Sequence, residues 1–322
     1  MPPVPLQIAV HRNFASELAK ELTIPHQLTS FKDESDAEMA ELLTRTDVLV
    51  SGAFKPAWRT EGAARLRLVH STGAGTDGIA FGALPAGCVV CNVYGHERGV
   101  AEQAFLLMMA LQRGLFALDA SLRKGDWTPQ RPYLPEMRDR SLLILGYGHI
   151  GQELVRWGQF LGMQVRVLTR TPDRVRSTAA EGVAVGPLAE LGLRLSEADF
   201  VVVAIPAATG TLDLIGAREF ALMKSTAFLI NVGRGPVVNE QDLFNALKSR
   251  RIGGAGLDVW YQYPAPGQNR LPATCPFQEL DNVIMTPHKP TLETMAYRWK
   301  EIAANLARHA RGEPLVRIVS AP

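Results

Sequence analysis

Short apolar runs alternate with amphipathic stretches along the amino-terminal part of the chain. Apolar residues cluster at 6–10, 48–51 and 68–70, and an amphipathic pattern at 14–22 follows the first of these runs. Such alternation is typical of strands connected by helices that cover a sheet. The pattern therefore predicts a lobe built from β–α units.

A longer helical pattern follows between residues 100 and 122. Its apolar positions recur at the spacing of one helix face. We therefore expect one continuous helix that bridges two lobes, with apolar residues at Phe105, Met108, Met109, Leu111, Leu115 and Phe116.

A second series of apolar runs begins at residue 141 and continues to residue 285. These runs are nearly all apolar rather than alternating, as in strands of a parallel sheet that is covered on both faces. A final helical pattern spans residues 292–311. The fold class is therefore doubly wound α/β, with strands at 141–145, 165–169, 200–205, 227–232, 256–259 and 283–285.

Composition limits the classes of partner. Among 322 residues, 47% are hydrophobic, and 34 basic residues against 32 acidic ones leave a net charge of only +2. This composition is typical of globular proteins, and no basic run is present that could track a phosphate backbone. The apolar stretch at 104–118 is interrupted by Gln112, Arg113 and Gly114. We expect neither a nucleic-acid partner nor a membrane span.

Cysteine usage and the amino terminus bear on localisation. The chain has three cysteines, and residues 1–5 lack the charged flank and apolar stretch of a signal peptide. Cys88 and Cys91 form a C-x-x-C pattern in a valine-rich run that we interpret as a strand, where residues three apart point to opposite faces. We expect a cytoplasmic protein with unpaired thiols and no metal site.

A glycine motif follows the first strand of the second series. Gly146, Gly148 and Gly151 form G-x-G-x-x-G, with His149 and Ile150 between the last two, at the start of a helical pattern. Glycines in this position permit a tight turn, and the free N–H groups of the helix amino terminus attract a pyrophosphate. Glycines can also simply end a strand, but this context predicts a dinucleotide site.

The next strand ends in Thr169 and Arg170, where dinucleotide-binding folds that use NAD usually carry an acidic residue. A guanidinium without a neighbouring carboxylate would accept the 2′-phosphate of NADPH. The residues therefore favour NADP(H), while NAD(H) stays possible. In the alternative interpretation, Arg170 is a solvated surface residue.

Arg234, Asp258 and His288 follow three further predicted strands, at the edge where open α/β sheets bind ligands. Arginine can hold a carboxylate and polarise a ketone, and histidine can give or take a hydroxyl proton. Taken singly, Arg234 could form a structural ion pair and His288 could be a core residue. Their joint placement favours hydride-transfer chemistry.

As a set, these motifs resemble the D-isomer-specific 2-hydroxyacid dehydrogenase family. The family includes glyoxylate/hydroxypyruvate reductases, phosphoglycerate dehydrogenases and formate dehydrogenases. Besides the glycine motif, the resemblance rests on segments 73–77 (GAGTD), 100–103 (VAEQ), 231–235 (NVGRG) with 237–239 (VVN), 257–259 (LDV) and 287–288 (PH). These segments span nearly the whole chain.

The resemblance implies a split chain. A flavodoxin-like substrate domain would comprise residues 1–98 and 290–322, and a Rossmann cofactor domain at 99–289 would be inserted in it, with the active site between them. Trp127 lies in a segment similar to one that packs on the partner subunit in family members, which implies a homodimer. Burial within the subunit is the alternative for Trp127.

The resemblance also implies residue roles and an NAD(P)-dependent enzyme acting on a small 2-oxo or 2-hydroxy acid. Arg234 would bind the substrate carboxylate and carbonyl, and His288 would be the acid in reduction. The backbone amides of Ala74 and Gly75 would hold the carboxylate, and Asp258 would meet the nicotinamide carboxamide. Phe54 is a candidate pocket wall, although core packing explains it equally well. Residues expected to line the cofactor are Ala204, Pro206 and Val232.

The chain departs from the family at Tyr263. Family members usually carry a glutamate there, which bonds the histidine and raises its pKa, whereas a neutral tyrosine supplies no charge. We therefore predict that Tyr263 orients His288, that the pKa of His288 lies near 6.5, and that reduction is fastest at mildly acidic pH.

Two alternatives stay open. Formate dehydrogenases also carry a neutral residue, glutamine, at the position of Tyr263, but segment 95–97 reads GHE where they have an asparagine. A dinucleotide-sensing regulatory protein would not need the glutamate either. The presence of Arg234 and His288 opposes the regulatory alternative.

Overall fold

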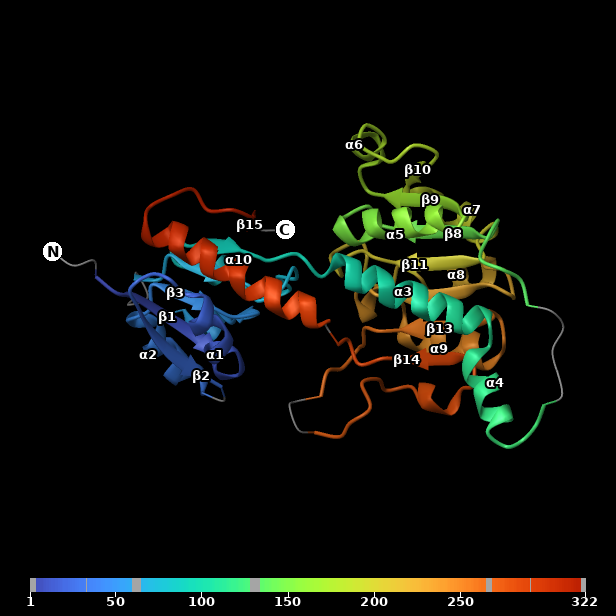
Figure 1. Ribbon diagram of the computed structural model, residues 1–322, viewed down its shortest axis with the longest axis horizontal. Helices are drawn as coiled ribbons and strands as arrows, with labels where there is room; N and C mark the ends of the chain where they lie inside the picture. The colour runs from blue at the N-terminus through green and yellow to red at the C-terminus, as the bar shows by residue number, and fades with distance from the viewer. Residues whose placement is uncertain are drawn as a thin grey trace. The chain divides into compact units, whose positions relative to one another are not determined.

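The computed structural model describes residues 4–32, 34–59, 65–127, 134–264, 268–289 and 291–319 (Figure 1). The chain divides into two compact units, one formed by Met1–His96 with Thr291–Pro322 and the other by Glu97–Pro290. The first unit is therefore built from both ends of the chain.

The sheet of the first unit has the strand order β15-β7-β5-β3-β1-β2. All neighbouring strands are parallel except β15, which runs antiparallel to β7. A separate strand pair, β4 (Ala53–Phe54) and β6 (Gly78–Ile79), lies outside it. The strands of the larger sheet are β1 (Leu6–His11), β2 (His26–Phe31), β3 (Val48–Val50), β5 (Leu68–His70), β7 (Val89–Cys91) and β15 (Ile318–Val319).

Several elements of this unit, among them β2 and α2 (Asp36–Thr44), were not identified from the hydrophobic pattern. Strand β2 is an edge strand and mixes polar with apolar residues, so it lacks the continuous apolar run of a buried strand. Helix α2 begins with a capping box between Ser35 and Glu38.

The carboxyl-terminal helix α10 (Leu292–Ala310) is tied to the centre of this sheet. Asn305 donates to Nε2 of the buried His70 over 3.1 Å and also bonds both backbone groups of Val316. Nδ1 of His70 donates to the carbonyl of Ser71. Burial lowers the pKa of His70 to about 4, so the imidazole is neutral and bonded at both nitrogens.

The second unit carries a parallel sheet of order β10-β9-β8-β11-β12-β13-β14. This order reverses direction next to β8, as in dinucleotide-binding α/β folds. The predicted strands are present, and the edge strand β10 is an addition to them. The strands are β8 (Ser141–Leu145), β9 (Gln164–Thr169), β10 (Ala184–Pro187), β11 (Phe200–Val203), β12 (Phe228–Asn231), β13 (Gly254–Leu257) and β14 (Val283–Met285).

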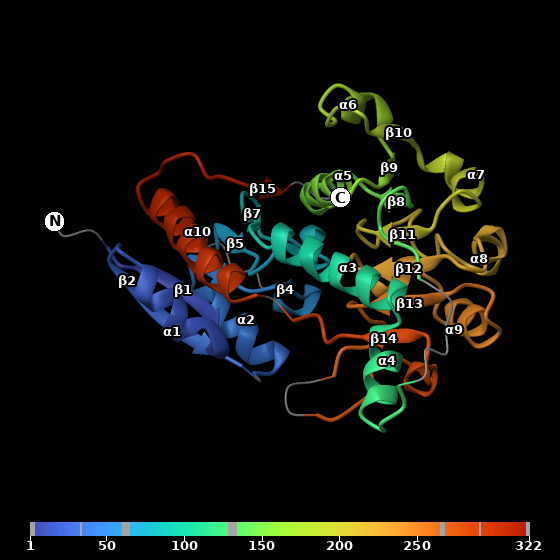
Figure 2. The same cartoon turned by 45° about the vertical axis from the view of Figure 1, so that its right-hand side comes forward.

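The helix predicted at 100–122 is two helices, so the prediction of one continuous helix was wrong. Helix α3 (Glu97–Gln112) and helix α4 (Leu115–Leu122) meet at Gly114, whose φ of 57° is left-handed, and the axis bends there by 57° (Figure 2). A left-handed residue cannot continue a right-handed helix. Among the described helices, none alone has the length and apolar character to cross a bilayer, and only the bent pair together reaches it.

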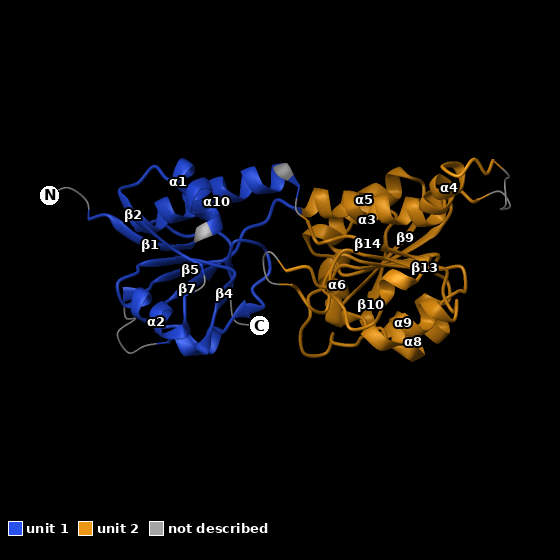
Figure 3. Ribbon diagram, turned by 90° about the horizontal axis from the view of Figure 1, so that it is seen from below, with its two compact units in different colours: residues 1–96, 291–322 blue, residues 97–290 orange. Residues whose placement is uncertain are grey.

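Helices cover both faces of each sheet (Figure 3). In the first unit, Ile8 and Val10 pack in the core shared with α1 (Arg12–Glu21) and α10, while Ala9 packs on the α2 side. In the second unit, α3 and α5 (His149–Phe160) cover one face and α8 (Ala217–Leu222) and α9 (Glu240–Lys248) the other. The remaining helices are α6 (Pro172–Arg176) and α7 (Leu191–Leu195), with short 3-10 turns at Pro56–Trp58, Phe81–Ala83, Leu188–Glu190, Gly235–Val237 and Phe277–Glu279.

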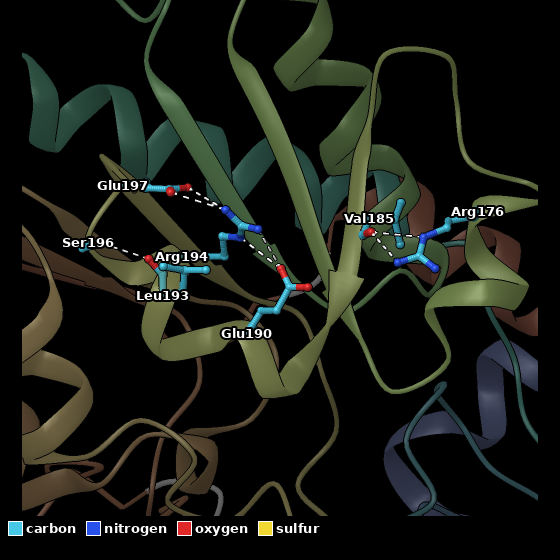
Figure 4. Close-up of polar contacts among 7 residues, drawn as sticks. All are labelled: Arg176, Val185, Glu190, Leu193, Arg194, Ser196 and Glu197. Carbon is cyan, nitrogen blue, oxygen red and sulfur yellow. Dashed lines mark hydrogen bonds and ion pairs between the residues drawn. The ribbon is translucent and has the colours of Figure 1, made fainter.

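Charged side chains form contacts at strand β10 and around helix α7 (Figure 4). Arg176 donates to the carbonyl of Val185 on the edge strand β10, and Arg194 pairs with Glu190 and Glu197. Of these residues, Arg194 and Glu197 line a cavity of about 780 Å³ at the starts of β8 and β9. This cavity lies at the opposite end of the strands from the predicted chemistry.

Candidate active site

The candidate residues of the second unit gather at one edge of its sheet. All strands of this sheet are parallel, so their carboxyl ends share that edge. The segments that start at Gly146, Ala204, Val232 and Asp258 follow β8, β11, β12 and β13 there. The sheet thus brings together segments that are far apart in the sequence.

The glycine turn after β8 has the geometry of a phosphate-binding loop. Gly146 has a φ of +104°, and a Cβ on it would lie 2.7 Å from the carbonyl oxygen of Ala204. A Cβ on Gly151 would lie 2.2 Å from the carbonyl oxygen of Gly146, whereas a Cβ on Gly148 would meet no atom within 4 Å. Protein packing thus requires the first and third glycines, and the second leaves open space above the turn.

Helix α5 begins directly after that open space. Its first intrahelical bond runs from the N–H of Gln152 to the carbonyl of Gly148, so the N–H groups of Ile150 and Gly151 precede the helical ladder. Free N–H groups at a helix start favour an anion. These residues fit the pyrophosphate of a dinucleotide, which would lie against the Gly148 backbone.

Thr169 ends strand β9, and Arg170 follows it. Arg170 is exposed, and no acidic residue stands at 169–171. The hydroxyl of Thr169 accepts from the N–H of Thr171 and shapes the turn into α6. The turn therefore presents a guanidinium to solvent at the carboxyl edge of the sheet.

The loop that carries Arg234 is held by Asn231, the last residue of β12. The side chain of Asn231 is 1% exposed, and it donates to the carbonyl of Arg234 and accepts from the N–H of Gly233. A Cβ on Gly233 would lie 2.7 Å from the carbonyl oxygen of Ile205, and one on Gly235 would lie 2.3 Å from that of Trp260. The arginine thus projects from a turn wedged against its neighbouring segments.

Asp258 belongs to a second network at the same edge. Its buried carboxylate accepts from the hydroxyl of Thr286 over 2.6 Å. Gln103 of α3 donates to the same hydroxyl, and the indole of Trp260 donates to the Thr286 carbonyl. The carboxylate of Asp258 is therefore held at the end of β13.

Tyr263 and His288 form a direct pair. The tyrosine hydroxyl lies 3.0 Å from Nδ1 of His288, and the hydroxyl oxygen also accepts from the N–H of Trp260. His288 has a φ of +51°, an uncommon conformation for a non-glycine residue. With Nδ1 held by Tyr263, Nε2 is the nitrogen left to exchange a proton with a ligand.

The pKa of His288 lies below its ordinary value of 6.5. Protein atoms around the ring displace water that would solvate the imidazolium, and this desolvation is the main cause. Asp258 raises this pKa and Arg234 lowers it. Desolvation also raises the pKa of Tyr263, so its hydroxyl is neutral at physiological pH. The prediction was a pKa nearer 6.5 than a glutamate partner would give, and desolvation lowers the pKa in the same direction.

The candidates in the first unit differ in exposure. Phe54 is fully buried and packs against Trp58 with ring centroids 6.0 Å apart. Its side chain belongs to the core, which favours the core-packing alternative, and a role as a pocket wall stays a prediction. Ala74 and Gly75 lie in a half-exposed loop after β5. Cys88 and Cys91 are free thiols whose pKa values burial raises to about 11, and among the described residues no cluster could hold a metal ion.

Sequence reasoning missed the supporting roles of Asn231, Gln103 and Thr286. All three belong to motifs already noted or adjoin them, but the motifs do not reveal which side chains meet. Gln103 and Thr286 are 183 residues apart. Only the packing of α3 against the sheet joins them.

Comparisons with known proteins agree with this geometry. Residues 105–289 match the family model described as D-isomer specific 2-hydroxyacid dehydrogenase, NAD binding domain. A glyoxylate reductase of Korarchaeum cryptofilum is 33% identical over 303 residues, covering 89% of this chain and 87% of the relative. A D-3-phosphoglycerate dehydrogenase of Methanocaldococcus jannaschii is 31% identical over 88% of this chain.

The chain spans about half of that phosphoglycerate dehydrogenase, 54% of its length. Among solved structures, an NADPH-dependent glyoxylate/hydroxypyruvate reductase from Sinorhizobium meliloti in complex with NADP and malonate superposes with a TM-score of 0.82 at 24% identity. That comparison covers 98% of this chain and 97% of the other. It shows that the two proteins share a fold.

The glycine turn yields a matched pair of variants. Gly148→Ala should leave the free energy of unfolding unchanged and weaken dinucleotide binding about tenfold or more, because its Cβ enters only the open space. Gly151→Ala should instead destabilise the fold by about 1–3 kcal/mol through overpacking against Gly146. Chemical unfolding and NADPH fluorescence titration check both. Equal destabilisation by the two variants would contradict this account of the turn.

Proposed function

We propose a reductase function for this chain, which belongs to the D-isomer specific 2-hydroxyacid dehydrogenase family. It would transfer a hydride between NAD(P)H and a small 2-oxo acid, yielding the 2-hydroxy acid. The observation that carries the proposal is the grouping of Arg234, Asp258 and the Tyr263–His288 pair at the sheet edge that also bears the glycine turn.

Arg234 and His288 supply the two functions that ketone reduction needs from the protein. The guanidinium of Arg234 binds the substrate carboxylate and carbonyl oxygen and stabilises the negative charge that develops on that oxygen. The protonated imidazole of His288 donates a proton from Nε2 to the same oxygen and becomes neutral. NAD(P)H, when bound, would be the source of the hydride that the carbonyl carbon accepts, and solvent returns the proton to His288.

Tyr263 orients the imidazole in both protonation states. Nδ1–H of His288 donates to the hydroxyl oxygen of Tyr263 both in the imidazolium and in the neutral ring left after Nε2 gives up its proton, so the 3.0 Å contact is kept throughout the cycle. Because Tyr263 is neutral, it adds no charge that would stabilise the imidazolium. Proton supply by His288 would therefore be the step most sensitive to pH.

Other residues would hold the cofactor and substrate. The turn at Gly146, Gly148 and Gly151, with His149 and Ile150, would bind the pyrophosphate, and Asp258 would meet the nicotinamide carboxamide. Ala204 and Pro206 follow β11 and Val232 follows β12, and these residues would line the cofactor. In the first unit, the backbone amides of Ala74 and Gly75 would hold the substrate carboxylate. Glyoxylate and hydroxypyruvate are the substrates we propose: two relatives are named glyoxylate reductase, and a structural neighbour is named glyoxylate/hydroxypyruvate reductase.

We further propose that the protein is a cytoplasmic homodimer. Helix α4 has no buried residue, and its apolar side chains are exposed together with Trp127 at 80%. An apolar surface of this kind supports a subunit interface. The free cysteines support a reducing compartment. The exposed residues are Leu115, Phe116, Leu118, Leu122 and Trp127.

Turnover of glyoxylate, hydroxypyruvate, pyruvate and phenylpyruvate, followed as NADPH and NADH oxidation, tests the proposed function. Arg234→Ala should lower kcat/KM about 10²–10³-fold while NADPH affinity stays within twofold, because the arginine acts on substrate and not on cofactor. An inactive wild-type protein that binds NADPH tightly would favour a regulatory protein. Oxidation of formate by NAD(P)+ would favour the formate-type alternative.

The rate of reduction should rise as the pH falls. His288 must be protonated to act, and its lowered pKa places the midpoint of the kcat/KM profile below pH 6.5. Tyr263→Glu should shift this midpoint upward, since a carboxylate stabilises the imidazolium, whereas Tyr263→Phe should not shift it upward. Rates of reduction measured from pH 5.5 to 9 check both variants. A wild-type rate that does not change between pH 6 and 9 would contradict the assignment of His288 as the acid.

Arg170 should set cofactor preference. Arg170→Ala should weaken NADPH binding about ten- to a hundredfold and leave NADH binding within twofold, because only NADPH carries the 2′-phosphate. Arg166→Ala, near the amino end of the same strand β9, is the matched control and should change neither affinity. Equal loss of NADPH and NADH binding in Arg170→Ala would show that the arginine does not read the 2′-phosphate.

A further inference from the structure

Three consecutive carbonyl groups in the loop after β5 are each held by a donor. The carbonyl of Gly73 accepts from the N–H of Val93 over 3.2 Å. The carbonyl of Ala74 accepts from the side-chain amide of Asn92 over 2.9 Å, and that of Gly75 accepts from the hydroxyl of Ser71 over 2.8 Å. These donors stand at the carboxyl ends of the neighbouring strands β5 and β7.

The trans geometry of the peptide bonds determines where the N–H groups of this loop point. In a trans peptide the C=O of one residue and the N–H of the next point in opposite directions, and this chain has no cis bond. Holding the carbonyls of residues 73–75 toward the strand ends therefore turns the N–H groups of Ala74, Gly75 and Thr76 away from them. Across the part of the chain that the structure describes, none of these three N–H groups donates a hydrogen bond.

Asn92 is buried although one of its polar atoms has no hydrogen-bond partner. Asn92 is 4% exposed, and its Oδ1 has no partner among the described residues. Burying an unpaired amide oxygen costs free energy that an apolar residue would avoid. Packing alone would favour an apolar residue at this position. The hydrogen bond that Asn92 donates to the carbonyl of Ala74 explains why an asparagine is present.

Ser71 is likewise buried and hydrogen-bonded. It is 1% exposed, and its hydroxyl also accepts from the N–H of Gly73. Its own carbonyl accepts from Nδ1 of His70, and its N–H donates to the carbonyl of Cys91. The hydroxyl that holds the loop therefore belongs to a residue whose backbone is fixed by hydrogen bonds to β5 and β7.

We propose that Ser71 and Asn92 are positioning residues that aim three backbone N–H groups, those of Ala74, Gly75 and Thr76, at the carboxylate of the substrate. Successive outward N–H groups form an anion-binding concavity, and a carboxylate has lone pairs enough for three donors. The proposal rests on the proposed 2-oxo acid reductase function and adds Thr76 as a third donor. Two side chains that do not touch the substrate thereby control its affinity.

Kinetics of Ser71→Ala and Asn92→Leu in the full-length chain test the proposal. Each should raise KM for glyoxylate and hydroxypyruvate about tenfold, with a smaller fall in kcat, because positioned donors to a charged group are lost. NADPH affinity, measured by fluorescence, should stay within twofold. Ser71→Thr keeps the hydroxyl and should restore KM.

The chain offers matched controls. Thr46 is buried and donates its hydroxyl to the carbonyl of Leu42 over 2.8 Å, and Asn282 donates to the carbonyl of Leu247 with its Oδ1 also unpartnered. Thr46→Val and Asn282→Leu remove comparable buried bonds outside the loop. They should lower stability without raising KM. Equal KM increases in these controls would overturn the positioning role.

A measurement that needs no turnover separates this proposal from the proposed function. In the wild-type chain, selectively ¹⁵N-labelled, titration with oxamate should shift the amide resonances of Gly75 and Thr76, and Ser71→Ala should abolish these shifts. An active wild type whose KM is unchanged in both variants overturns the proposal and leaves the function standing. An inactive wild type overturns the function, and the oxamate titration then decides alone, because absent shifts reject the cradle and present shifts support it.

Discussion

The common direction of the strands is the constraint on which the site depends. Because all the strands of the second unit are parallel, every strand ends at the same edge, and the segments that follow them converge there without any contact in sequence. The glycine turn after β8, the arginine loop after β12 and the aspartate after β13 all depend on this register. A change in register of one strand would move one functional group and leave the others in place, so the buried apolar faces that set the register also set the chemistry.

The hydrogen-bond partner of the histidine is the main departure from the family pattern. A glutamate would bring a charge that stabilises the imidazolium, whereas Tyr263 brings only geometry. Burial and Arg234 then lower the pKa of His288, and Asp258 alone among its named neighbours raises it. A histidine with a lower pKa is a stronger acid once it is protonated, and a smaller fraction of it is protonated at neutral pH. With a neutral tyrosine as its partner, a smaller fraction of His288 is protonated at neutral pH than with a glutamate, but the protonated form is a stronger acid.

The sequence predicted those parts of the protein that rest on local pattern. The continuous apolar strands of the second unit and the G-x-G-x-x-G turn were recognisable because each imposes a residue type at a fixed spacing, as the contacts of Gly146 and Gly151 illustrate. The break between α3 and α4 escaped prediction because apolar residues recur at helical spacing on both sides of Gly114, and the spacing alone does not reveal its left-handed φ. Phe54 and the Gln103–Thr286 bond could not be assigned, since both depend on which surfaces meet after folding. Edge strands β2 and β10 were missed because an edge does not need a continuous apolar run.

An asparagine at the end of a strand orients a loop in both units. Asn231 ends β12 and donates to the carbonyl of Arg234, and Asn92 follows β7 and donates to the carbonyl of Ala74. Both side chains are nearly inaccessible to solvent, so their bonds do not compete with water. Aspartate has a similar shape but no donor, and it would place a negative charge beneath loops proposed to bind a carboxylate. The amide meets both requirements, because it fixes a carbonyl and remains uncharged, and the peptide that it holds can then present its N–H to an anion.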